Sequence, residues 1–540
     1  MKVVIVGGNA LGASTAARLR RLDENVEITI VEKNDYVSFA NCGLPYYLSG
    51  IIASSNSLFV TSKDELKRKY KLNLLDRTEM IGLDENKKVI FISSENGEEE
   101  ITYDYLVLAM GSINNVPPIK IDEGVKYHTL HTVEDAIELK KTLVNKKKVA
   151  IVGAGFIGLE LLDNILNDKK EIHLFEATDK IASLDEDMSL FSLNILKKRG
   201  VNVHLNSAIK EMSKEGDKIL LHYDNENLEV DDVIMVTGVK PNIKPIEGSS
   251  IKLIANRFID VDDHLRTNNP YIYAGGDLIL STQMISKAKI YAPLAGYANK
   301  DARIIANNIM GMKEKRSEVL RTSIFHLLGY AFGRVGLSED ECKKLNISYK
   351  CLYSLPFNHV TYYPGAKRLF QKVIFYESGL ILGATIIGEV DVPRKIDTLS
   401  AIMRKHGIYI DLMNLDLSYS PVYGSAKDGL NMIGFMFDNE VRLGQKNISP
   451  LDFYKKKDSL FILDVRARSD FDNFHFDNAI NIPFSELRER ISELPNDKTI
   501  YVICYTGVSS YNSCRLLSNL GFDVINVQGG HAFLKVLNLL

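Results

Sequence analysis

Apolar residues gather in short runs along this chain, and the first of these runs ends in a pair of glycines. Residues 2–6 read KVVIV, a continuous apolar stretch typical of a strand buried in a parallel sheet. The stretch GGNALGAS follows at once, TAARLRRL predicts a helix, and VEITIVEK predicts a second strand. This order of strand, glycine turn, helix and strand predicts an α/β unit.

The first glycine turn has the spacing of a dinucleotide-binding fingerprint. Gly7 and Gly12 occupy the first and third glycine positions, while Asn9 stands at the second. Glu32 follows Gly12 by 20 residues. That spacing lets an acid reach a ribose hydroxyl while a pyrophosphate lies at the helix N-terminus. A glycine-rich turn in an unrelated α/β unit is the alternative interpretation.

The same pattern recurs at KKVAIVGAGFIGLELL, which carries Gly153, Gly155 and Gly158 after a strand. The next strand leads to Glu176, 18 residues after Gly158. An acid here favours the 2′-hydroxyl of NADH over the 2′-phosphate of NADPH. Lys180 lies close enough in sequence to meet a phosphate, so NADPH stays open.

Two later segments complete a recognisable set: YDYLVLAMGS, a strand that ends in a small-residue turn, and LRTNNPYIYAGGDL. Together with the two fingerprints, they resemble the two-dinucleotide-binding flavoprotein disulfide reductases over about residues 1–440. The resemblance implies FAD at the first site, NADH or NADPH at the second, and Asp277 on the ribityl chain. The expected cofactor contacts are Gly7, Gly8, Ala10, Gly12, Glu32, Lys33, Ala109, Gly111, Asp277, Gly153, Gly155, Gly158 and Glu176.

Cys42, in VSFANCGLPYYLSG, has no second cysteine nearby. A single thiol stores its oxidised equivalent as a sulfenic acid or as a mixed disulfide with a small thiol. The stretch resembles the single-cysteine branch of the family, most closely its coenzyme A-disulfide reductases. Only a thiolate attacks a disulfide, so we expect the pKa of Cys42 to be lowered, by a helix end and tyrosine hydroxyls. A buried packing cysteine is the alternative.

The resemblance also implies a coenzyme A site and a homodimer. Arg18 and Arg21 would meet the phosphates, although a solvated helix face explains such a run equally simply. Two departures stand out: Val422-Tyr423 replaces the usual proline-phenylalanine, and Asn299 stands where some members place a histidine. The expected substrate contacts are Ser14, Arg18, Arg21, Ser38, Asn41 and Lys427, and the expected catalytic tyrosines are Tyr362, Tyr363 and Tyr419, of which Tyr362 or Tyr363 would reach the partner subunit's thiol.

After about residue 450, short apolar strands alternate with amphipathic helices, and VICYTGVSS places Cys504 at a strand end before a tight loop and a helix. This segment resembles a single-domain rhodanese, whose loop amides converge on the sulfur and hold a persulfide's charge. The usual loop is C-R-x-G-x-R-S, but Tyr505 and Ser509 replace both arginines. We therefore expect weak use of dianionic thiosulfate, with a persulfide or polysulfide as donor. A degenerate docking domain is the alternative.

Composition narrows the picture further. With 540 residues, 45% hydrophobic, and a net charge of −3 without a basic arm, the chain predicts several globular domains and no nucleic-acid partner. No apolar run reaches the roughly 20 residues that a membrane helix needs. Five scattered cysteines without a CxxC pair predict neither a structural metal site nor a disulfide framework, which fits a reducing cytoplasm. We interpret Cys342, Cys351 and Cys514 as packing residues.

The expected fold is α/β, with four domains. They are an FAD-binding domain at 1–115 and 250–321, an NAD(P)H-binding domain at 116–249, an α+β dimerisation domain at 322–440 and, after a linker at 441–450, an α/β rhodanese domain at 451–540.

The expected function is reduction of coenzyme A disulfide, coenzyme A persulfide or polysulfide by NAD(P)H through FAD and Cys42, with sulfane sulfur handled on Cys504. An NADH oxidase or peroxidase of the same fold is one alternative. Its peroxidase-type members carry a histidine in the first glycine loop, where this chain has Ala10. A coenzyme A-binding persulfide or redox sensor is the other. The sequence does not rank the acceptors.

Overall fold

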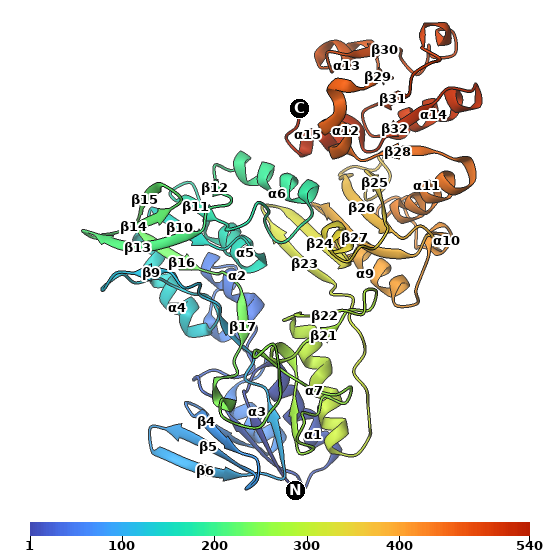
Figure 1. The fold of residues 1–540 in the computed structure, drawn as a ribbon. Coiled ribbons are helices and arrows are strands. Elements are labelled where there is room, and N and C mark those ends of the chain that lie inside the picture. The colour runs from blue at the N-terminus through green and yellow to red at the C-terminus, as the bar shows by residue number, and fades with distance from the viewer. The chain divides into compact units, whose positions relative to one another are not determined.

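The computed structural model describes all 540 residues, and the chain divides into two compact units (Figure 1). The first unit comprises Met1–Asp179, Asn202–Gln283 and Lys287–Val319. The second comprises Lys180–Val201, Met284–Ser286 and Leu320–Leu540. The expected α/β architecture, with two dinucleotide-type sheets, an α+β domain and a C-terminal α/β domain, is confirmed.

A five-stranded parallel sheet forms the first core of the first unit, in the order β20-β7-β1-β2-β3. Its strands are apolar and almost fully buried because helices and loops cover both faces, as parallel sheets require. The last strand in sequence pairs with β7, so the chain returns to this sheet after the second one is complete. The strands are β1 (Lys2–Val6), β2 (Glu27–Val31), β3 (Asn73–Leu75), β7 (Tyr105–Leu108) and β20 (Ile272–Ala274).

A second parallel sheet has the order β12-β11-β10-β16, with strands β10 (Lys148–Val152), β11 (Glu171–Phe175), β12 (Asn202–His204) and β16 (Asp232–Met235). In the first sheet, the last residue of β1 lies opposite the last residues of β2 and β7. In the second sheet, the last residue of β10 lies opposite those of β11 and β16. Each glycine turn therefore sits beside its acid at the carboxyl edge, where nucleotides bind in such sheets.

Smaller sheets and helices complete the first unit. The small-sheet strands are β4 (Glu79–Asp84), β5 (Val89–Ser94), β6 (Gly97–Thr102), β8 (Ser112–Asn114), β9 (Lys120–Ile121), β13 (Ile209–Glu215), β14 (Lys218–Tyr223), β15 (Glu226–Val230), β17 (Val239–Pro241), β18 (Leu253–Ile254), β19 (Phe258–Ile259), β21 (Ser281–Thr282) and β22 (Lys289–Ile290). The helices are α1 (Ala10–Leu22), α2 (Leu44–Ser49), α3 (Lys63–Tyr70), α4 (Val133–Thr142), α5 (Phe156–Ile165) and α7 (Ala295–Ile309).

An antiparallel sheet of order β23-β24-β27-β26-β25 forms the first core of the second unit. Every residue of β26 and β27 is buried, so both faces of these strands are covered. The strands are β23 (Ser323–Leu327), β24 (Tyr330–Gly336), β25 (Lys350–Ser354), β26 (Leu369–Phe375) and β27 (Ile381–Gly388). The helices are α6 (Glu186–Lys198), α8 (Glu339–Lys344), α9 (Val392–Met403), α10 (Tyr409–Met413) and α11 (Gly429–Leu443). Of these, α6 comes from the range expected for the NAD(P)H-binding domain.

The C-terminal part of the second unit is a parallel sheet of order β28-β32-β31-β29-β30 with helices around it. Its strands are β28 (Lys446–Ile448), β29 (Phe461–Asp464), β30 (Ala479–Asn481), β31 (Ile500–Ile503) and β32 (Val524–Val527). Its helices are α12 (Pro450–Lys456), α13 (Arg468–Asn473), α14 (Val508–Asn519) and α15 (Gly530–Val536).

The segment expected as a linker, residues 441–450, is largely ordered secondary structure. It contains the end of α11, a turn at Gly444 with φ +61°, and β28, which pairs with β32. Its polar residues suit an edge strand, which exposes one side to solvent. The chain therefore passes from the last helix of one domain into the sheet of the next without a free tether.

Side chains of the C-terminal domain pack directly on the antiparallel sheet. The Gln528 side-chain oxygen accepts a hydrogen bond from the Tyr353 amide at 2.8 Å, and its nitrogen donates to the Cys351 carbonyl at 3.3 Å. The Phe533 ring packs edge-on against Tyr353 and Phe370, with centroids 5.4 and 5.8 Å apart. Because Gln528 hydrogen-bonds to the backbone of β25, these contacts hold the C-terminal domain in one position on the antiparallel sheet.

A buried lysine ties three chain segments of the second unit together. Lys372, on β26, is fully buried, and its ammonium lies 3.0 Å from Asp185, 3.1 Å from Asp187 and 2.7 Å from Glu339. The lysine holds the pKa of Glu339 down to about 2 against the opposing effect of burial, and the pKa of Lys372 itself is raised by the acids around it. Buried charges persist only when paired, so this cluster is a structural centre.

Replacing Lys372 tests that role. The substitution Lys372→Met leaves buried carboxylates without their cation, which typically costs about 3–5 kcal/mol. Lys343→Met is the matched control because Lys343 pairs with Glu339 at the surface, where such a pair contributes under about 1 kcal/mol. Thermal unfolding followed by circular dichroism should show a far larger fall in the midpoint temperature for Lys372→Met than for Lys343→Met. Equal falls in the two variants would contradict the account.

Candidate active site

The first glycine turn is a close-packed cradle between β1 and α1. Gly7 has φ +105°, and a Cβ there would lie 2.2 Å from the Ala109 carbonyl oxygen. A Cβ on Gly12 would lie 1.8 Å from the Gly7 carbonyl oxygen. Neither position admits a side chain, so backbone stands open at the N-terminus of α1. This is the arrangement that a pyrophosphate needs.

Glu32 closes the cradle from the neighbouring strand. It is buried and accepts a hydrogen bond from the Gly8 amide at 2.7 Å and another from the Asn34 amide at 2.9 Å. Burial raises its pKa. Lys33 points outward and pairs with Glu79 at 2.8 Å. The acid expected to bind a ribose is therefore fixed at the edge of the cradle.

Asn9, the departure from the glycine fingerprint, has a structural reason. Its side chain donates to the Asn41 side-chain oxygen at 2.7 Å and accepts from the Phe39 amide at 3.1 Å. These bonds tie the glycine turn to the segment that carries Cys42. Ala10 begins α1 directly behind it. A glycine at position 9 would remove both bonds.

The far end of the first site is polar and buried. The Ser112 hydroxyl donates to Asp277 at 2.8 Å, and burial raises the pKa of that carboxyl. The Tyr291 hydroxyl is buried without a hydrogen-bond partner, and its pKa is raised by burial and by the nearby charge of Asp277. Gly111 has φ +65° with open space beside it. These polar groups, together with the glycine cradle, fit FAD.

The second glycine turn repeats the first. A Cβ on Gly153 would lie 2.5 Å from the Val236 carbonyl oxygen, and one on Gly158 would lie 2.0 Å from the Gly153 carbonyl oxygen, while Gly155 faces open space. Glu176 accepts from the Ala154 amide at 3.1 Å. Lys180 forms an ion pair with Asp340. The groups fit a nicotinamide nucleotide, and no basic residue pairs with Glu176.

Cys42 lies in a one-turn 3₁₀ segment, Asn41–Gly43, that leads into α2. Its side chain is exposed, yet enough protein surrounds the sulfur for desolvation to raise its pKa. The second cause is the negative charge of Glu160 on α5. The surroundings within the first unit thus oppose the lowered pKa expected from the sequence. Any stabilisation of the thiolate must come from groups outside this set.

Three of the expected substrate residues, Ser14, Arg18 and Arg21, follow at helical spacing on α1. The Ser14 hydroxyl donates to the Asn299 oxygen at 2.7 Å, and Arg18 donates to the Asn307 oxygen at 2.9 Å, so this face meets α7. Arg21 is exposed. A hydrogen-bonded, basic seam therefore runs along α1 and α7.

Arg303, an exposed residue of α7, was not among the residues expected from the sequence. It lies four residues after Asn299 and four before Asn307, and that periodicity was the available signal. Arg20, in contrast, is buried and donates to backbone carbonyls, so it is structural. Ser38, another expected substrate contact, has φ +50° and lies against the glycine turn, because its amide donates to the Gly8 carbonyl.

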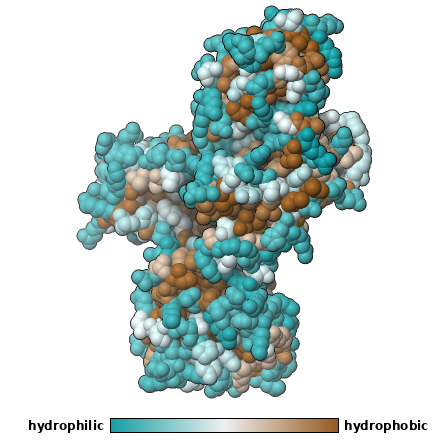
Figure 2. Space-filling model, turned by 45° about the vertical axis from the view of Figure 1, so that its right-hand side comes forward, coloured by the Kyte–Doolittle hydropathy of each residue, from teal (hydrophilic) through white to brown (hydrophobic).

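In the second unit, the expected tyrosines form an exposed group. The hydroxyls of Tyr362 and Tyr419 lie 3.4 Å apart, and the side chains of Tyr362, Tyr363 and Tyr419 are 75%, 40% and 49% exposed. Val422 and Tyr423, the departure from the usual pair, are exposed too. Lys427 is exposed beside Asp428, which is buried and paired with Lys395. Figure 2 shows hydrophobic residues reaching the molecular surface among hydrophilic ones.

Cys504 lies at the carboxyl end of β31, at the start of the loop that precedes α14. The Gly507 amide donates to its sulfur at 3.1 Å, and the Ser510 hydroxyl lies 3.3 Å away. Gly507 has φ +91°, and a Cβ there would lie 2.9 Å from the Gly529 nitrogen. Ser510 in turn donates to Asn526 at 2.7 Å. The loop thus presents a donor, a hydroxyl and a helix N-terminus to one buried sulfur.

The remaining thiols are buried or half-buried. Burial raises the pKa of Cys342 to about 12 and raises the pKa of Cys351 and Cys514 as well. Neutral, shielded thiols are inert, in keeping with the packing role expected for them. All five cysteines are free.

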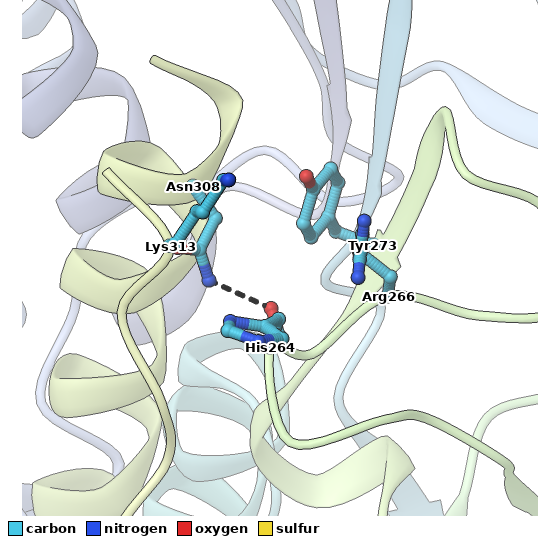
Figure 3. A pocket seen from close by; sticks show the side chains of 5 residues that line it. All are labelled: His264, Arg266, Tyr273, Asn308 and Lys313. Carbon is cyan, nitrogen blue, oxygen red and sulfur yellow. Dashed lines mark hydrogen bonds between the residues drawn. The ribbon is translucent and has the colours of Figure 1, made fainter. Parts of the chain in front are cut away.

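A separate small cavity of about 120 Å³ lies beside β20 (Figure 3). His264, Arg266, Tyr273, Asn308 and Lys313 line it, and Asn308 donates to the His264 carbonyl at 2.9 Å. Ligand pockets usually exceed about 300 Å³, so this one is too small for a nucleotide. It is not among the sites expected from the sequence.

No group of three or more histidine, cysteine, aspartate or glutamate side chains is arranged to hold a metal ion. No helix combines the length and the apolar character needed to cross a bilayer.

Two curated relatives match about four fifths of the chain. One is "NADH oxidase" from Methanocaldococcus jannaschii, 28% identical over 437 residues, which covers 80% of this chain and 97% of the relative. The other is "Coenzyme A disulfide reductase" from Staphylococcus haemolyticus, 31% identical over 441 residues, which covers 80% of this chain and 98% of the relative.

Two solved structures match nearly all of it. The reduced CoADR-RHD of Bacillus anthracis is 31% identical with a TM-score of 0.95, covering 99% of this chain and 98% of that one. The NAD-dependent persulfide reductase from A. fulgidus is 33% identical with a TM-score of 0.93, covering 99% of this chain and 100% of that one.

Two family matches cover the two parallel sheets of the first unit and most of the C-terminal parallel sheet. The pyridine nucleotide-disulphide oxidoreductase family matches residues 1–292, and the rhodanese-like domain matches residues 449–532. The family resemblance read from the glycine turns and from the Cys504 loop is thereby confirmed. The chain belongs to the pyridine nucleotide-disulphide oxidoreductase family, as an oxidoreductase that uses FAD and a nicotinamide nucleotide and carries a C-terminal rhodanese-like domain.

Proposed function

We propose that this enzyme reduces coenzyme A persulfide, coenzyme A disulfide or polysulfide with NAD(P)H, and that Cys42 is its redox thiol. The observation that carries this proposal is a lone exposed cysteine whose neighbour in sequence, Asn41, accepts a hydrogen bond from Asn9 in the glycine turn that fits FAD. The basic seam of α1 and α7 begins at the same turn and offers Arg18, Arg21 and Arg303 to phosphates. Coenzyme A carries three phosphate groups in addition to its thiol, so it suits a site that combines a reactive cysteine with several arginines.

The proposed reaction has two balanced steps. The Cys42 thiolate forms a bond to the coenzyme A sulfur, and the leaving group is coenzyme A thiolate from the disulfide or hydrosulfide from the persulfide. Two electrons then cleave the Cys42–coenzyme A disulfide, which regenerates the Cys42 thiolate, and a proton completes coenzyme A thiol. Bound NAD(P)H and FAD supply the electron pair.

Both the proton donor and the groups that stabilise the Cys42 thiolate have to come from outside the first unit. Burial and Glu160 raise the pKa of Cys42, so neutral thiol is favoured there. We propose that a second copy of the chain supplies the exposed hydroxyls of Tyr362, Tyr363 and Tyr419 and the ammonium of Lys427. Their exposure in one protomer supports this assignment, because a hydrogen-bonded tyrosine pair at a surface is suited to an interface.

Glu176 and Lys180 influence the choice between NADH and NADPH. Glu176 carries the negative charge next to the second cradle, and Lys180 is already paired with Asp340. A 2′-phosphate would therefore meet a like charge without a free cation, which favours NADH. The free state of all five thiols supports placement in the reducing cytoplasm.

An NADH oxidase is the second candidate function, because a curated relative carries that name. The first glycine turn presents Ala10 rather than a side chain that could handle a proton from peroxide. A coenzyme A-binding redox sensor would use the same residues with slow turnover. The persulfide reductase is favoured because the Cys504 domain is part of the same chain and belongs to a fold that carries sulfane sulfur.

Separate replacement of the two thiols tests the division of labour. Cys42→Ser should lower NADH-dependent reduction of coenzyme A disulfide by about a thousandfold or more, since no thiolate remains to form the mixed disulfide. Flavin binding, read from the visible spectrum, should persist. Cys504→Ser is the matched control and should leave disulfide reduction unchanged. Disulfide reduction that survives in Cys42→Ser would sink the proposal.

The charge of Glu160 can be tested through the reactivity of Cys42. Glu160→Gln removes the negative charge that disfavours the thiolate, so the pKa of Cys42 should fall. Alkylation of the reduced holoenzyme by iodoacetamide, measured on Cys42 by mass spectrometry, should then shift its pH profile to lower pH. Asp163→Asn, on the same helix, is the control and should leave the profile in place. Identical profiles for wild type and Glu160→Gln would be inconsistent with this electrostatic coupling.

A further inference from the structure

The loop around Cys504 must bring two anions together but contains no basic residue. Residues 504–510 read CYTGVSS. A thiolate and an anionic sulfur donor repel each other as they approach bonding distance, and this repulsion is strong where solvent is partly excluded. The Gly507 amide and the N-terminus of α14 can stabilise the charge on Cys504. They leave the charge of the incoming donor unmatched.

Arg368, from the neighbouring antiparallel sheet of the same unit, lies beside this loop. It directly precedes β26, and its guanidinium carbon is 5.9 Å from the ring centre of Tyr505, the residue after Cys504. Two further contacts hold it in place. It donates to the Leu355 carbonyl at 2.9 Å and stacks over the Phe357 ring at 4.2 Å.

The docking of the two domains fixes this arrangement. Gln528, which pairs with the backbone of β25, directly precedes Gly529 and Gly530. A Cβ on Gly530 would lie 2.1 Å from the Cys504 carbonyl oxygen, so the same turn that docks the domain supports the Cys504 loop. The Ala532 amide also donates to the Tyr505 carbonyl at 2.8 Å. The position of Arg368 relative to Tyr505 therefore depends on a short series of fixed contacts.

Arg368 is also an uncompensated charge. It is half-buried, burial lowers its pKa, and no carboxylate forms an ion pair with it. Its neighbour Lys367, in contrast, is paired with Glu389 at 2.8 Å. A desolvated guanidinium without an anion is unfavourable unless a ligand supplies one.

We propose that Arg368 is the specificity-determining residue of the Cys504 site, and that it binds the anionic sulfane-sulfur donor that the loop itself cannot bind. It would take over from another domain the role of the loop cations that Tyr505 and Ser509 replace. This inference rests on the proposed function only in assuming that Cys504 carries sulfane sulfur.

The step that Arg368 assists is balanced without an added oxidant. The Cys504 thiolate attacks the terminal sulfur of a donor R–S–S⁻, a new S–S bond forms to Cys504, and the donor's own S–S bond breaks. The products are Cys504–S–S⁻ and R–S⁻, and the latter takes one proton from water. Arg368 offsets the second negative charge during the attack.

Loading of Cys504 in the full-length holoenzyme tests this role. The variants are Arg368→Met, Arg368→Lys and the matched control Lys367→Met, and the readout is the rate at which Cys504 gains one sulfur atom by mass spectrometry. The donors are thiosulfate, coenzyme A persulfide and cysteamine persulfide, whose ammonium offsets its own negative charge. For thiosulfate and coenzyme A persulfide, Arg368→Met should slow loading about tenfold, the usual effect of one charged hydrogen bond.

Three further results are expected. Cysteamine persulfide should be affected least, Arg368→Lys should recover part of the rate because charge matters more than shape, and Lys367→Met should match wild type. Added salt should slow wild type more than Arg368→Met. Reduction of coenzyme A disulfide, which depends on Cys42, should be equal in all variants and reports an intact fold.

Two outcomes would overturn the inference. The first is loading of Arg368→Met at the wild-type rate with all three donors. The second is an equal loss for all three donors, which would indicate a general disturbance of the loop. Both outcomes can occur while Cys42→Ser still abolishes disulfide reduction, so failure here is distinguishable from failure of the proposed function.

Discussion

A cysteine attacks sulfur only as a thiolate, and the groups of the first unit around Cys42 favour the neutral thiol. Burial and the carboxylate of Glu160 both raise its pKa. In the proposed reaction, the cofactors and a second copy of the chain supply the stabilisation that these groups do not give. The exposed hydroxyl pair of Tyr362 and Tyr419 and the unpaired Lys427 are suited to that task. A thiol that ionises only when its site is assembled is also protected from wasteful oxidation.

The second unit joins two chemistries through ordinary packing. Lys372 holds α6, α8 and β26 together, and the backbone of β25 pairs with Gln528 beside the Cys504 loop. The C-terminal domain is therefore held in a fixed position, and the linker expected at 441–450 contains the strand β28. A fixed domain position allows a residue of one domain to complete the site of another, which a loosely tethered domain could not do. Arg368 beside Tyr505 is the clearest instance.

Local features of the site could be predicted from the sequence, whereas long-range ones could not. The sequence predicts the roles of Gly7, Gly12 and Glu32, because a tight turn and an acid at fixed spacing suffice to define the cradle. The hydrogen bond from Asn9 to Asn41 could not be predicted from the sequence, because the two residues meet only in the folded chain. The first unit does not lower the pKa of Cys42 as expected, because desolvation by the folded chain raises it, and the charge of Glu160, on a helix distant in sequence, raises it further. Arg303 was missed although its helical spacing was readable.

The most direct test of the central claim compares two acceptors in steady-state NADH oxidation under nitrogen. Coenzyme A persulfide and coenzyme A disulfide share the phosphates that the seam of α1 and α7 offers to bind, and they differ only in the group that leaves. The proposed function predicts a higher kcat/KM for the persulfide, because hydrosulfide is a weaker base than coenzyme A thiolate and therefore leaves faster. The Cys504 domain of the same chain is proposed to carry the same form of sulfur. A higher kcat/KM for the disulfide would contradict the proposed function, and so would rapid NADH oxidation in a parallel assay in air that contains neither acceptor.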